Sequence, residues 1–91
     1  MNKSELIKIL AEENDILIEE ADTIVNVFID TIKDFLIKGS RVEIRSFGSF
    51  KIKNYNGYVG RNPKTGDIVT VQPKQLPFFR VGKELKEYIN Q

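Results

Sequence analysis

The apolar residues of the first forty positions recur every three or four residues, which predicts two amphipathic helices. The first helix is expected over residues 2–14, because Asn2 and Glu5 have the spacing of a capping box. The second is expected over residues 18–38, and Gly39 follows it in the position where many helices end. Its apolar stripe comprises Ala21, Ile24, Val25, Phe28, Ile32, Phe35 and Leu36.

The second helix is apolar over more than half of its circumference. Val27 and Ile29 fall outside the main stripe, so the first helix alone leaves apolar side chains uncovered. A chain of 91 residues also buries only a modest fraction of its surface unless it pairs with another chain. A second copy of the chain is therefore the expected cover for this helix.

Apolar and charged residues alternate over residues 41–47, which predicts a strand. A turn is expected over residues 47–50, because a glycine stands between two phenylalanines there, and a second strand should follow over residues 50–55. Large rings beside a tight glycine turn usually pack inward, so Phe47 and Phe50 are predicted to belong to the core.

Residues 54–74 are rich in Asn, Gly, Tyr, Lys, Thr and Pro and are expected to form a long hairpin. A strand of about ten residues at ~3.3 Å each would carry the hairpin tip roughly 35 Å outward. A two-stranded ribbon of this kind is marginally stable in water, so we expect it to be mobile until it binds a ligand. Residues 76–79 then return the chain to the core, and a short helix is predicted over residues 83–90.

The composition makes catalysis and metal binding improbable. The sequence has no cysteine and no histidine, which removes disulfides, thiol nucleophiles, zinc fingers and the usual general base. We therefore expect no enzyme activity, no cofactor and no metal site. The amino terminus lacks the apolar run of a secretion signal, and no segment approaches the ~18 apolar residues of a membrane span. An intracellular, soluble protein is the expectation.

The net charge of +1 conceals two halves of opposite sign. Residues 1–40 contain four lysines and nine acids, a net charge of −5, whereas residues 41–91 contain ten Lys or Arg and four acids, a net charge of +6. A charge imbalance is most often a solvated face. Here the positive half includes the predicted hairpin, and a local density of cations attracts phosphates more directly than the average charge does.

The tip of the hairpin carries the most distinctive chemistry, in the heptapeptide Gly60-Arg61-Asn62-Pro63-Lys64-Thr65-Gly66. A phosphate-binding P-loop would need its second glycine before the lysine and a helix after it, and neither condition is met. A minor-groove reader would use the whole set, with Arg61 and Lys64 on phosphates and groove edges, Asn62 on bases and Pro63 as a wedge between base steps. The remaining alternative is a turn that merely closes a hairpin.

Three blocks of the sequence resemble the signature blocks of the bacterial HU and integration host factor family. They are Val42-Glu43-Ile44-Arg45-Ser46-Phe47-Gly48-Ser49-Phe50, the tip heptapeptide, and Leu76-Pro77-Phe78-Phe79-Arg80-Val81-Gly82-Lys83-Glu84-Leu85-Lys86. Their order and spacing also match, and the resemblance spans essentially the whole chain.

The resemblance implies an α+β fold and an intertwined dimer, with a helical body, a saddle of antiparallel strands and two long β-ribbon arms. The chain would be a single domain over residues 1–91, with its helical part over 1–40, and the strands, an arm over about 52–75 and the C-terminal helix within 41–91. The implied function is to bend duplex DNA in the cytoplasm, at the bacterial nucleoid, as a homodimer or as a heterodimer with a sister subunit. No small-molecule substrate and no membrane partner are implied.

The resemblance, with the charge pattern, also indicates which residues bind DNA. The predicted DNA contacts are Arg45, Ser46, Lys51, Lys53, Arg61, Asn62, Pro63, Lys64, Lys74, Arg80, Lys83 and Lys86, with Pro63 as the intercalating residue. The predicted dimer core comprises Phe28, Phe47, Phe50, Phe78 and Phe79.

Arg45, expected in the strand before the Phe-Gly-Ser-Phe turn, resembles the integration host factor beta subunit, in which an arginine there contributes sequence preference. The alternative for Arg45 is a solvent-facing arginine paired with Glu43. Arms of the family usually carry several arginines where this chain has Tyr55, Asn56 and Tyr58, so the salt dependence of binding should be shallower. The alternative function for the whole chain is a structural module whose arm docks a protein partner or swaps between chains.

Overall fold

The computed structural model describes residues 1–91, and the first of its two compact units, Met1–Asp34, is a pair of helices. Helix α1 spans Lys3–Asn14, and helix α2 spans Ile18–Ile37, with its last turn in the second unit. The Glu5 N–H donates to Asn2 Oδ1 at 2.9 Å, so Asn2 caps α1 as the sequence predicted. The core between the helices consists of buried Ile7, Ala11, Ala21 and Val25, surrounded by Leu10, Ile16 and Ile29.

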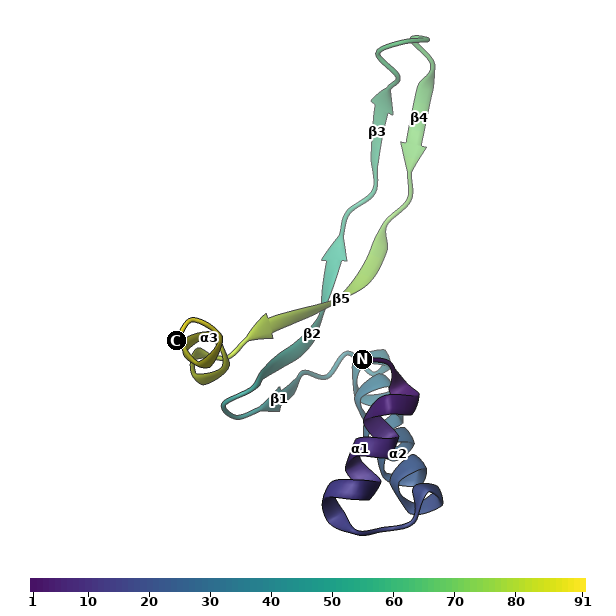
Figure 1. The fold of residues 1–91 in the computed structure, drawn as a ribbon. Coiled ribbons are helices and arrows are strands. Elements are labelled where there is room, and N and C mark those ends of the chain that lie inside the picture. Colours follow the sequence, from purple (N-terminus) through teal and green to yellow (C-terminus); the bar gives the residue numbers. More distant parts are fainter. The chain divides into compact units, whose positions relative to one another are not determined.

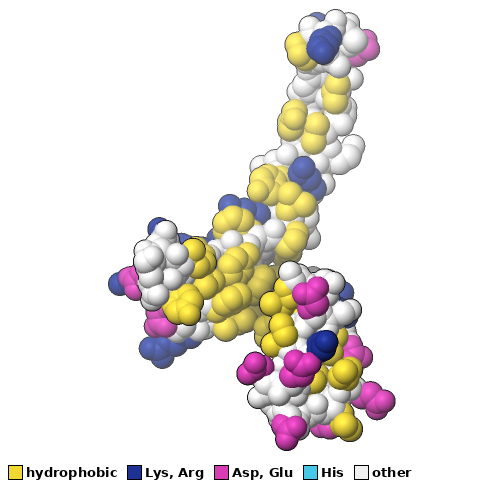
Figure 2. Space-filling model, in the orientation of Figure 1, with side chains coloured by type: hydrophobic (Ala, Val, Ile, Leu, Met, Phe, Trp, Pro, Cys, Tyr) yellow, Lys and Arg dark blue, Asp and Glu magenta, His cyan; other side chains and the backbone are white.

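Part of the apolar surface of α2 is left uncovered by α1. Ile24 and Phe28 of the stripe, and Val27 beside it, are each more than half exposed, whereas Ala21 and Val25 of the same stripe are buried. Figure 2 shows acidic side chains over the surface of the helical unit, with hydrophobic atoms between them. The excess apolar surface predicted for this helix is therefore confirmed.

Gly39 ends the second helix, as predicted. Its φ angle is +81°, and its N–H donates to the Leu36 carbonyl at 2.9 Å, while the Ser40 N–H donates to the Phe35 carbonyl at 2.8 Å. This pair of hydrogen bonds is a Schellman motif, which needs a residue in the left-handed conformation after the helix. The helix ends at Ile37, one residue earlier than expected.

The second unit, Phe35–Gln91, consists of five strands and a short helix. Strands β1 (Val42–Ile44), β2 (Gly48–Tyr55) and β5 (Lys74–Val81) form an antiparallel sheet in the order β1-β2-β5. Strands β3 (Tyr58–Arg61) and β4 (Ile68–Val71) form a separate antiparallel ribbon, and α3 spans Lys83–Ile89. None of the three helices is both long and apolar enough to cross a membrane.

The ribbon continues the pairing of β2 with β5 without a change of register. Tyr55 is opposite Lys74 in the sheet, and Tyr58 is opposite Val71 in the ribbon, so the same alignment of the two chain segments holds on both sides of the interruption. Pairing is interrupted at residues 56–57 and 72–73, where Pro73 has no N–H to donate. Figure 1 shows the ribbon of β3 and β4 extending from the end of β2 and β5.

The turn between the first two strands lies two residues earlier than the sequence predicted. Residues 45–47 form the turn, and the Phe47 N–H donates to the Ile44 carbonyl at 3.0 Å. Ser46, not a glycine, adopts the left-handed conformation there, with a φ angle of +76°. Arg45 is consequently a turn residue rather than a strand residue.

Gly48, which was expected in the turn, is the first residue of β2. A glycine is needed there because of close packing, not because of a turn. A Cβ atom at this position would lie 2.5 Å from the ring of Phe79 and 2.6 Å from the carbonyl oxygen of Arg80. Glycine is therefore required because strand β5 and its phenylalanine pass directly over it.

Candidate functional site

The register of the three-stranded sheet sorts its residues into an apolar face and a cationic face. Successive residues of a strand point to opposite faces, and directly opposite residues share a face. The pairs Ser49–Arg80, Lys51–Phe78, Lys53–Leu76 and Tyr55–Lys74 all lie on one face, together with Glu43, which is opposite Ser49. We call this the cationic face, because it carries Lys51, Lys53, Lys74 and Arg80.

The opposite face is apolar and carries most of the predicted core rings. Phe50 and Phe79 are directly opposite each other, with ring centroids 4.8 Å apart, and Phe47 lies 5.3 Å from Phe79. Phe79 is still 38% exposed and Phe47 45% exposed, so the chain by itself leaves this face uncovered. Figure 2 shows hydrophobic surface over the region of β2 and β5, with Lys and Arg side chains along its edge.

Phe78 does not lie with the other rings of the predicted dimer core. It is opposite Lys51 on the cationic face, and its ring lies under the ammonium groups of Lys53, at 3.7 Å, and Lys51, at 5.8 Å. Alternation along β5 requires this, because Phe79 next to it occupies the apolar face. Phe78 therefore does not share a face with Phe79, with which it was assigned to the dimer core.

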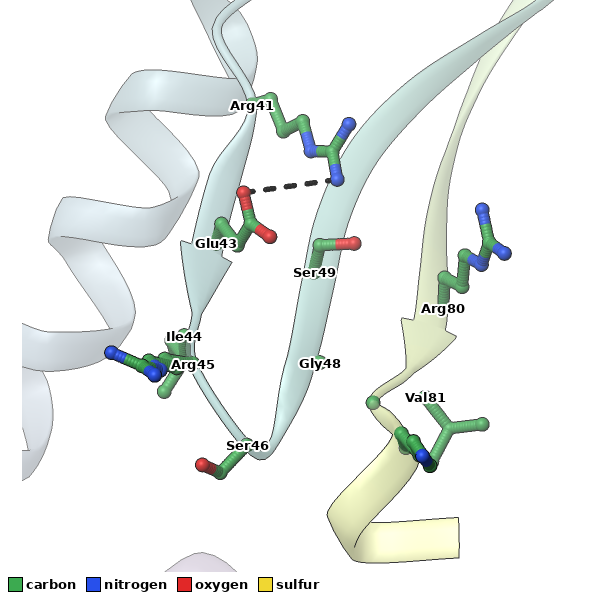
Figure 3. A pocket seen from close by; sticks show the side chains of 11 residues that line it. Arg41, Glu43, Ile44, Arg45, Ser46, Gly48, Ser49, Arg80 and Val81 are labelled. Carbon is green, nitrogen blue, oxygen red and sulfur yellow. Dashed lines mark ion pairs between the residues drawn. The ribbon is translucent and has the colours of Figure 1, made fainter.

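A cleft of about 340 Å³ opens at the end of the sheet near the β1–β2 turn. Four cationic side chains line it, namely Arg41, Arg45, Arg80 and Lys83, together with the nearly buried Ser49. Figure 3 shows Ser49 between the Arg41–Glu43 pair and Arg80, whereas the side chain of Arg45 extends away from Arg80. Arg41 and Ser49 were not among the predicted site residues. The pairing of Ser49 with Glu43 and Arg80 places it on the cationic face, and Arg41 joins it through its ion pair with Glu43.

Glu43 pairs with Arg41 and not with Arg45. The carboxylate of Glu43 lies 3.8 Å from the Arg41 guanidinium, and both side chains are more than half exposed. An exposed pair of this kind contributes little to stability. The alternative in which Arg45 serves as the partner of Glu43 is therefore wrong, and the Arg45 side chain at the turn has no ion-pair partner within the chain.

The tip of the ribbon is held by hydrogen bonds of Asn62. The Asn62 N–H donates to the Asp67 carbonyl at 2.8 Å, and its own carbonyl accepts from the Gly66 N–H at 2.7 Å. Its side-chain Oδ1 accepts from the Lys64 N–H at 2.9 Å, which encloses Pro63 in an Asx turn. Of the polar groups of Asn62, only the side-chain NH₂ donor remains without a partner.

Pro63 is exposed at this tip, as the sequence predicted for a hairpin turn. Arg61 ends β3 opposite Ile68, and Lys64 follows the proline, so two exposed cations flank the ring. The tip therefore presents one apolar ring and two cations on a turn whose shape is determined locally.

The remaining predicted contacts lie at the other end of the second unit. Ser46 belongs to the β1–β2 turn, and Lys83 and Lys86 belong to α3. The ammonium of Lys83 lies 3.9 Å from Glu87, and both side chains are largely exposed. The structure thus distributes the predicted cations over the tip, the cationic face and the turn–helix end of the unit.

Residues 1–90 match the family described as bacterial DNA-binding protein. Among solved structures, the chain is similar to HU from Anabaena in a cocrystal with DNA, with a TM-score of 0.85 and 31% sequence identity over 98% of this chain and 97% of that one. It is similar to HU from Thermotoga maritima, with a TM-score of 0.69 and 29% identity over 98% of each chain. A mutant of transcription factor 1, solved in solution, matches with a TM-score of 0.65 and 26% identity over 99% of this chain and 91% of that one.

Proposed function

The chain belongs to the family of bacterial DNA-binding proteins, and from this premise we propose that it is an architectural protein that binds and bends duplex DNA in the bacterial nucleoid. The observation that carries the proposal is the cationic face, where Lys51, Lys53, Lys74 and Arg80 lie on one side of a sheet whose other side is apolar. A family of DNA-binding proteins also agrees with the expectation that the chain is not an enzyme.

The proposed binding mode uses the ribbon of β3 and β4 as an arm in the minor groove. Arg61 and Lys64 would contact phosphates and groove edges, and the exposed ring of Pro63 would enter between two base pairs and kink the duplex, as the resemblance implies. The side-chain oxygen of Asn62 already accepts a hydrogen bond from the backbone, so its role toward a base is limited to donation through its NH₂ group.

The bent duplex would then reach the body of the protein. Lys51, Lys53, Lys74 and Arg80 on the cationic face, with Ser46, Lys83 and Lys86 at the turn–helix end, would contact the phosphate backbone there. Phosphate contacts supply most of the affinity and position the protein on the duplex. Cations at the tip and at the base of the arm are therefore both needed for a bend to be stable.

We propose that the functional unit is a dimer, either of this chain or with a sister subunit. The support is the pair of uncovered apolar surfaces, one on α2 around Phe28 and one on the apolar face around Phe47, Phe50 and Phe79. Exposed apolar patches of this kind on a small chain mark protein interfaces. A dimer would also supply the second arm that a symmetric bend requires.

The alternative, in which the arm docks a protein partner, predicts a different salt dependence. Binding to DNA releases counterions, so affinity should fall linearly on a log–log plot against salt concentration. Docking to an uncharged protein surface has no reason to follow that relation. Filter binding with a random duplex at several salt concentrations distinguishes the two functions, and a flat plot or no binding would exclude the DNA-binding proposal.

Replacement of Lys53 by alanine should weaken binding to all sequences and reduce the log–log salt slope by roughly 0.9, because one phosphate contact is lost. Lys33→Ala, on the acidic helical unit, is the matched control and should leave the slope unchanged. Equal slopes for Lys53→Ala and the wild-type chain would remove Lys53 from the phosphate contacts.

Replacement of Arg45 tests whether the chain shares the sequence preference of the integration host factor beta subunit. Its side chain has no ion-pair partner in the chain and projects from the β1–β2 turn, so it is available to a base. Arg45→Ala should narrow the difference in binding free energy between a selected and a random duplex by about 1–3 kcal/mol. A wild-type chain without preference for any selected duplex would show that the protein reads DNA shape alone.

Sedimentation equilibrium should show a dimer at micromolar concentration. Phe28→Glu introduces a charge into the exposed apolar surface of α2 and should shift the population toward monomer, because burial of an unpaired carboxylate is strongly unfavourable. Glu19→Gln, on the same helix outside the stripe, is the control and should sediment like the wild-type chain. A monodisperse, folded wild-type monomer would contradict the dimer proposal.

Replacement of Pro63 by alanine should separate binding from bending. Pro63→Ala keeps the phosphate contacts, so substantial binding should remain, but without the wedge the variant should lose much of the bend. Fluorescence energy transfer between dyes at the two ends of a short duplex measures this directly at saturating protein. An unaltered end-to-end distance would show that Pro63 only shapes the turn and that charge neutralisation bends the DNA.

A further inference from the structure

We propose that Phe78 is a positioning residue, whose ring holds the ammonium groups of Lys51 and Lys53 ready for phosphate on the cationic face. This proposal rests on the proposed DNA-binding function, because it concerns how two of the phosphate contacts are prepared. It assigns a role in binding to a residue that sequence analysis had placed in a hydrophobic core.

The sheet register brings one ring and two lysines together. Phe78 on β5 is directly opposite Lys51 on β2, and Lys53 is its diagonal neighbour on the same face. Diagonal neighbours across antiparallel strands are within reach of long and aromatic side chains. The Lys53 ammonium lies over the ring at 3.7 Å from its centroid, and that of Lys51 lies at 5.8 Å. Both distances fall within the range of cation–π attraction.

The burial of the cations supports the same arrangement. The sequence contains fourteen Lys and Arg residues, and only Lys51 and Lys53 are half-buried rather than exposed. Phe78 is half-buried as well, whereas Leu76 and Arg80, its neighbours on the same face of β5, are exposed. The ring and the two lysine stems therefore cover one another, with the apolar stems on the aromatic surface as expected for amphipathic side chains.

An ammonium that lies on a ring still has its opposite side, facing away from the ring, open to a second partner. The ring attracts the cation from one side only, while the three N–H donors of the ammonium can still be shared with a phosphate on the other side. A free lysine side chain loses rotamer entropy when a contact immobilises it. The ring restricts Lys53 before DNA arrives, so less of that entropy is lost on binding.

The chain provides an internal comparison on the same face. Tyr55 and Lys74 are directly opposite each other, but the Lys74 ammonium lies 6.0 Å from the Tyr55 centroid and both residues are exposed. Lys74 is thus about as far from its ring as Lys51 is from Phe78, but Tyr55 has no counterpart of the close Lys53 contact and does not cover its lysine. A Tyr55 variant is therefore the matched control for the loss of an aromatic ring that does not hold a cation closely.

The test compares Phe78→Leu with Phe78→Tyr and Tyr55→Leu in filter binding to one random duplex. Phe78→Leu should weaken binding about two- to five-fold, which corresponds to about 0.4–1 kcal/mol at 1.4 kcal/mol per tenfold. Its log–log salt slope should stay at the wild-type value, because the number of phosphate contacts is unchanged. Phe78→Tyr should retain wild-type affinity, and Tyr55→Leu should change it less than two-fold.

The effect of Phe78 should also depend on its lysines. In a Lys51→Ala, Lys53→Ala background, Phe78→Leu should have no further effect on affinity, because no cation remains for the ring to hold. A full additional loss in that background, or an equal loss from Tyr55→Leu, would overturn the proposal. It would then follow that the ring contributes to DNA affinity without acting through these lysines.

A measurement on the free chain separates this proposal from the proposed function. The ε-methylene protons of Lys53 should be shifted upfield by the ring current in the wild-type protein, and the shift should disappear in Phe78→Leu but not in Tyr55→Leu. An unshifted Lys53 in the wild-type chain would overturn the positioning role even if the protein binds DNA. A shifted Lys53 in a protein that does not bind DNA would instead refute the proposed function and leave the contact standing.

Discussion

The alignment of β2 with β5 is the constraint on which the second unit depends. Each pair in this ladder, from Gly48–Val81 to Tyr55–Lys74, assigns two residues to the same side of the sheet. A slip of β2 by one residue would turn its side chains to the opposite faces, placing Lys51 and Lys53 on the side of Phe79 and Phe50 on the side of Arg80. The passage of the Phe79 ring over Gly48 opposes such a slip, because no other position in β2 lacks a side chain.

The same alignment couples assembly to binding. The apolar face is exposed in the single chain, and a second chain would cover it in the proposed dimer, while the opposite face carries the cations that would contact the phosphate backbone. The sheet thus has an apolar side and a cationic side, and each is proposed to bind a different partner. In the proposed complex, dimerisation and DNA binding stabilise each other, because a partner on the apolar face holds the strands that carry the lysines in place.

Much of the fold could be predicted from the sequence, because its signals were local. Helical periodicity, the Asn2 cap, Gly39 after α2 and the long polar hairpin all followed from residues close together in the chain. The first turn was predicted at the wrong residues because glycine is the usual residue at a positive φ angle, whereas Ser46 adopts that angle here. Gly48 is instead required by a close contact with β5, which is distant in the sequence. Such a contact leaves no local trace.

The candidate site was predicted less completely than the fold. The cations of the cationic face and the proline at the tip were expected from the charge pattern, the turn chemistry and the family resemblance, but Phe78 was grouped with Phe79 because both are large and apolar. Alternation along a strand would have separated them, since two consecutive residues cannot face the same side. The use of the Asn62 oxygen by the backbone depends on the three-dimensional path of the tip. The dimer and the intercalation of Pro63 stay predictions.

The interruption at residues 56–57 and 72–73 divides the hairpin into two cooperative units. Beyond it, β3 and β4 have only each other, with four paired positions and no covering layer, whereas β2 gains a second neighbour in β1. Local opening of the ribbon can therefore proceed without loss of the sheet. A protease acting on the native protein would cut within this distal segment and leave two fragments held together by β2 and β5. In the proposed complex, such a cut would release the arm from the DNA while the rest of the fold persists.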